Sequence, residues 1–80
     1  MLSQHVRNYD RARTLETICD VWAHNRDWAI DKAMEYARAA MDEHDEELLK
    51  QARWQRKLAD MFDERLKRDR TELSALRCKP

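Results

Sequence analysis

The chain has 80 residues, and its formal net charge is zero because 16 basic residues balance 16 acidic ones. A length of eighty residues is expected to make one domain. Glycine is absent and the single proline is Pro80, a composition typical of an all-α protein. The balanced charge argues against intrinsic disorder, which usually goes with a high net charge.

The apolar core is expected to be thin. Leu, Ile, Val and Phe account for 13 of the 80 residues, below the roughly 20% at which disorder becomes plausible. The two cysteines, Cys19 and Cys78, lie far apart in sequence, and we expect a small buried thiol at 19 and an incidental thiol in a frayed tail at 78. With no disulfide framework to support so small a core, self-association as a homodimer is the predicted supplement.

The first predicted helix covers residues 3–24, with Ser3 as a candidate N-cap. Its broad apolar face contains Val6, Tyr9, Leu15, Ile18 and Trp22. A break is predicted at residues 24–27, because Asn25 tolerates the left-handed conformation that ends helices and Asp27 is a good N-cap. One continuous helix from Ser3 to Met41 is the alternative, which the absence of glycine leaves open.

The second predicted helix covers residues 28–42 and is expected to be the most enclosed. Its apolar row is Ile30, Met34, Ala37 and Met41, and a flank of alanines beside that row would allow close helix approach. Five acids then occur within residues 42–47. Because acids in a first turn complement the helix dipole, we expect a tight turn near 43–45.

The third predicted helix, residues 45–77, is the longest. Its seam, the row that faces a neighbouring helix at alternating steps of four and three, is Leu48, Ala52, Gln55, Ala59, Phe62, Leu66, Asp69, Leu73 and Leu76. Gln55 and Asp69 are polar at positions where a strong coiled coil has Leu or Ile. A second apolar stripe, Trp54, Leu58 and Met61, makes the apolar arc wider than one partner helix can cover.

These elements predict a small bundle of three helices, or a long helical hairpin, in one domain of residues 1–80. The third helix is too long for the other two to cover. Its exposed end is therefore expected to dimerise or to dock on another protein.

No motif in the chain indicates catalysis, a metal or a cofactor. His5, His24 and His44 are about twenty residues apart without a metal-ligand spacing, and there is no glycine-rich phosphate loop or nucleophile elbow. No segment approaches the roughly 20 apolar residues of a membrane span. We therefore expect a cytoplasmic protein that is not an enzyme.

The function predicted from these features is protein–protein interaction, in which a helix face docks on a partner as a regulator, inhibitor or adaptor. The apolar stripe on residues 54–61 has a basic border, which would favour an acidic partner surface. The predicted partner-binding residues are Trp54, Leu58, Met61, Lys50, Arg53, Lys57 and Arg65.

Two alternatives stay open. Residues 48–80 contain ten basic residues and five acids, so the chain could contact nucleic-acid phosphates through Lys50, Arg53, Lys57 and Arg68 while Trp54 stacks on a base. Affinity that falls steeply with salt would be the signature of that alternative. The other alternative is a structural or assembly subunit that acts only by oligomerising, and a solution mass well above the dimer would distinguish it.

Overall fold

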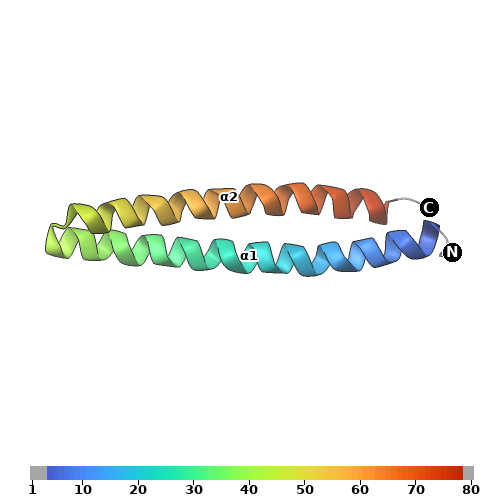
Figure 1. Ribbon diagram of the computed structural model, residues 1–80, viewed down its shortest axis with the longest axis horizontal. Coiled ribbons are helices and arrows are strands. Elements are labelled where there is room, and N and C mark those ends of the chain that lie inside the picture. Colours follow the sequence, from blue (N-terminus) through green and yellow to red (C-terminus); the bar gives the residue numbers. More distant parts are fainter. Residues whose placement is uncertain (1–3, 79–80) are drawn as a thin grey trace.

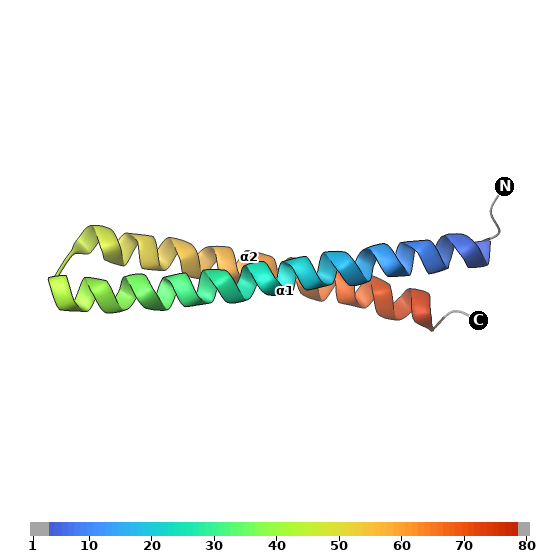
Figure 2. The same ribbon diagram turned by 90° about the horizontal axis from the view of Figure 1, so that it is seen from below.

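The computed structural model is a hairpin of two long antiparallel helices (Figure 1). The structure describes residues 4–78, apart from the side chain of His5. Helix α1 spans Gln4–Glu43 and helix α2 spans Glu46–Arg77. The Cα atoms extend 61 Å along the hairpin but only 15 and 14 Å across it, and Figure 2 shows the helices crossing at a shallow angle. The all-α prediction is confirmed, but as a helical hairpin and not as a three-helix bundle.

The predicted break at residues 24–27 is wrong, and the separate helices 3–24 and 28–42 are one helix of 40 residues. A seam of buried and half-buried residues runs through that region at alternating steps of four and three: Leu15, Cys19, Trp22, Arg26, Ala29, Ala33, Tyr36 and Ala40. Trp22 and Arg26, on either side of Asn25, both hydrogen-bond to α2. These tertiary contacts outweigh the local turn signal of Asn25 and Asp27. The predicted cap at Ser3 lies outside the described residues.

The predicted turn near 43–45 is confirmed. His44 adopts a positive φ of 52°, the left-handed conformation that commonly ends a helix. Asp45 is the N-cap of α2, and its carboxylate accepts hydrogen bonds from the backbone N–H groups of Glu47 at 2.9 Å and Leu48 at 3.4 Å. The acids of this segment therefore cap α2 and begin its first turn.

The predicted seam of α2 is confirmed at all nine positions, since each is buried or half-buried in the structure. The prediction that this helix is the longest and has an uncovered end is wrong. Helix α2 has 32 residues and α1 has 40, so α1 is the longest helix and runs along the whole of α2 (Figure 1).

The core between the helices is thin and changes in character along the hairpin. Leucines and a cysteine fill it toward the chain ends, and small side chains fill it toward the turn: Ala29, Ala40, Ala52 and Ala59 are buried there. Ala29 and Ala40 belong to the predicted alanine flank of residues 28–42, and both are buried. The expectation that residues 28–42 are the most enclosed is wrong, because Met34 and Met41 point to solvent and Met41 is 77% exposed.

Candidate interaction surface

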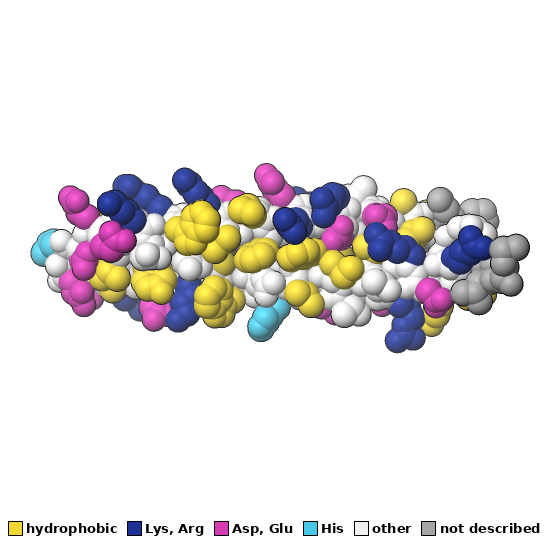
Figure 3. Space-filling view, in the orientation of Figure 1, with side chains coloured by type: hydrophobic (Ala, Val, Ile, Leu, Met, Phe, Trp, Pro, Cys, Tyr) yellow, Lys and Arg dark blue, Asp and Glu magenta, His cyan; other side chains and the backbone are white. Residues whose placement is uncertain are grey.

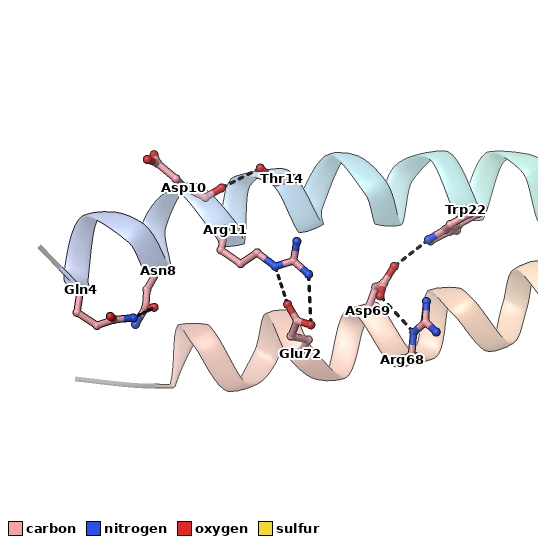
Figure 4. A network of polar contacts seen from close by, with 9 residues as sticks. All are labelled: Gln4, Asn8, Asp10, Arg11, Thr14, Trp22, Arg68, Asp69 and Glu72. Carbon is pink, nitrogen blue, oxygen red and sulfur yellow. Dashed lines mark hydrogen bonds and ion pairs between the residues drawn. The ribbon is translucent and has the colours of Figure 1, made fainter. Parts of the chain in front are cut away.

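Asp69, a polar residue in the apolar seam of α2, has a specific partner on α1. The indole Nε1–H of Trp22 donates a hydrogen bond to Oδ2 of Asp69 at 2.8 Å, and Arg68 Nε lies 3.6 Å from Oδ1 of the same carboxylate (Figure 4). Because the partly buried carboxylate is paired, it does not weaken the seam as an unpaired group would. Gln55 differs, since its Oε1 is buried without a hydrogen-bond partner among the described residues.

Trp22 also ties α1 to one side of α2. Its ring stacks on Phe62 with the ring centroids 5.9 Å apart. The guanidinium carbon of Arg65 lies 5.1 Å from the centroid of the Trp22 ring, within the range of a cation–π contact. The hydrogen bond to Asp69 fixes the indole plane, so Trp22 marks which residues of the two helices share this side of the hairpin.

On α2, this side contains the predicted apolar stripe. Leu58 lies four residues before Phe62, and Met61 lies four residues before Arg65. Each is therefore one helical turn from a residue that contacts Trp22. Trp54 precedes Leu58 by four residues and continues the stripe. Trp54 is 55% exposed, Met61 is 49% exposed and Leu58 is half-buried.

On α1, a row of residues spaced by seven begins at Arg11 and borders the same side. Arg11 Nε donates a hydrogen bond to Oε2 of Glu72 at 2.8 Å (Figure 4). Glu72 lies on the same side of α2 as Arg65 and Leu58, because it is seven and fourteen residues from them. The same row reaches Lys32, whose Nζ lies 6.0 Å from the centroid of the Trp28 ring. Trp28 is 52% exposed, and Val21, seven residues before it, is also exposed.

The two helices therefore present apolar side chains on the same side of the hairpin, and we call this set the tryptophan face: Val21, Trp22, Trp28, Trp54, Leu58 and Met61. Figure 3 shows hydrophobic side chains gathered along the middle of one face, over both helices. The α1 half of this face was not among the predicted site residues. The spacing of seven between Val21 and Trp28 was the signal in the sequence that could have revealed the α1 half. Met34 and Met41 lie on the other side of the α1 seam.

The charged border of the tryptophan face differs between its two edges. On the α2 edge, Lys50, Lys57 and Arg68 are exposed, while Arg65 covers Trp22. Lys50 Nζ lies 4.0 Å from Glu47. Arg53 is exposed but lies about 100° around the helix from Trp54, toward the back of α2. On the α1 edge, the exposed charges beyond Trp28 are mixed: Asp31, Glu35, Arg38 and Asp42.

The opposite side of the hairpin carries ion pairs and a shallow groove of about 470 Å³. Both thiols line this groove. Cys19 is buried as predicted, and burial raises the pKa of its thiol, while Cys78 is exposed. Arg77 and Glu16 form an ion pair across the same groove. Among residues 4–78, no group of three or more His, Cys, Asp or Glu side chains is placed to hold a metal ion.

Asp63 provides a test of the ion pairs between the helices. Its pKa is held below the ordinary value of 3.8 by hydrogen bonds from Lys67 at 2.9 Å and from Arg26 at 3.1 Å. Because the folded-state pKa is depressed, the stabilisation by Asp63 is fully present above pH 3.8 and is lost as pH falls through the folded-state pKa. Urea unfolding of Asp63→Asn should therefore show lower stability than the natural chain at neutral pH, and the difference should vanish in strong acid.

The control for this prediction is Asp60→Asn. Asp60 is an exposed carboxylate 3.7 Å from Arg56 on its own helix, so its loss should change stability less. A difference between Asp63→Asn and the natural chain that persists unchanged at the lowest pH would contradict the ionic origin of the effect.

Comparison with known proteins assigns no family to this chain, because no protein-family model, characterised protein or solved structure matches it. Neither described helix combines the length and apolar character needed to cross a lipid bilayer. The surface of the hairpin is therefore the basis for assigning a function.

Proposed function

We propose that this protein is a non-enzymatic interaction protein that binds a protein partner through the tryptophan face. The observation that carries the proposal is the half-exposure of Trp28 on α1 and of Trp54 and Met61 on α2, on the same side of the hairpin. Large apolar patches on a small soluble protein usually mark an interaction site. Tryptophan is also among the residues most enriched at the energetic centres of protein interfaces.

The hairpin itself explains why this face is left for a partner. Each helix covers only one side of the other, and the thin core of alanines and a few leucines buries little apolar surface. Two antiparallel helices packed side by side leave a groove between them into which the ridge of a third helix can pack. A partner helix in the groove beside Trp22, Leu58 and Phe62 would bury the exposed rings on both sides of it.

The basic border on the α2 edge supports an acidic surface on the partner. Lys50, Lys57 and Arg68 lie around Trp54 and Met61 and would raise the rate of encounter with such a surface. Rim charges mainly affect association rate and orientation, whereas the buried rings supply most of the affinity.

The test of the proposal is the double variant Trp54→Ala with Met61→Ala. Removal of two central apolar anchors is expected to weaken partner binding by more than about 30-fold, since hot-spot residues contribute about 2 kcal/mol or more each. Helicity should stay close to that of the natural chain, because both side chains are half-exposed. The readout is the mass of the assembly that contains the full chain, in cell extract and after purification.

The matched control is Met34→Ala with Met41→Ala, which removes two exposed methionines outside the tryptophan face. This control should leave the assembly intact. A natural chain that is monomeric both in extract and in purified form would overturn the proposal. A collapse of helicity in the Trp54 and Met61 variant would show that these residues belong to the core.

Nucleic-acid binding through the same edge is the second candidate. The observation in its favour is that Lys50, Lys57 and Arg68 are exposed on the same edge as Trp54, while the exposed Arg53 lies toward the back of α2. Lys50 and Arg68 lie close to acids of their own helix, which reduces the positive potential available to phosphates. Affinity for DNA or RNA that falls steeply with salt would favour this candidate over the first.

A further inference from the structure

We draw no further inference here: the strongest candidate, the exposed apolar patch of Trp28, Trp54 and Met61 on one side of the hairpin, belongs to the surface already described, and nothing in the structure shows which molecule covers it.

Discussion

Replacement of Leu66 by alanine is expected to unfold most of the protein at room temperature. Leu66 is 0% exposed and is, among the described residues, one of two large side chains that are fully buried. Substitution of a buried leucine by alanine typically costs about 2–5 kcal/mol. A single core of this size rarely supplies more than about 3–5 kcal/mol, so the loss is comparable with the whole stability of the hairpin. Far-UV circular dichroism during thermal unfolding, at one fixed protein concentration, measures the effect.

Leu49→Ala provides the matched control on the same helix. Leu49 is 40% exposed, so the same chemical change removes far less buried surface and should lower the melting temperature only slightly. Equal effects of Leu66→Ala and Leu49→Ala would contradict the position of the seam between α1 and α2.

The substitution Ala29→Leu is expected to have the second largest effect, by forcing the helices apart. Ala29 is fully buried, and it is three residues from the Arg26–Asp63 contact, which places it level with residues 59–60 of α2 and so beside the buried Ala59. Three added carbon atoms have no space between two alanine-lined surfaces. Overpacking of this kind typically costs about 1–3 kcal/mol, and urea unfolding would measure the loss.

Ala75→Leu is the control for this substitution, because Ala75 is exposed on α2. It adds the same side chain without entering the seam and should be nearly neutral. If Ala29→Leu were also neutral, the helices would be further apart near the turn than the buried alanines indicate.

The arrangement of the candidate site was only partly predictable from the sequence. The α2 half of the tryptophan face, Trp54, Leu58 and Met61, follows from helical spacing within one continuous segment. The α1 half does not, because its side depends on which row of α1 faces α2. Tertiary contacts decide that row: Trp22 hydrogen-bonds to Asp69 and stacks on Phe62, and this turns Val21 and Trp28 toward the stripe on α2.

The role of Asp69 shows a similar limit. From the sequence, its carboxylate in an apolar row predicted a position that weakens the packing of α2 against its neighbour. The sequence of α2 alone shows no hydrogen-bond partner for this carboxylate. In the hairpin it accepts the indole hydrogen bond of Trp22 at 2.8 Å. The partner is 47 residues away in sequence, beyond the reach of any local pattern.

The sequence by itself determined the features that depend on local chemistry. The absence of glycine and of internal proline predicts helices, the steps of four and three place all nine seam residues of α2, and the acids at 42–47 mark the turn that Asp45 caps. Only the tertiary structure decided that residues 24–27 remain helical. Asn25 and Asp27 favour a break locally, but Trp22 and Arg26 contact α2 on both sides of Asn25, and an unbroken α1 keeps both contacts.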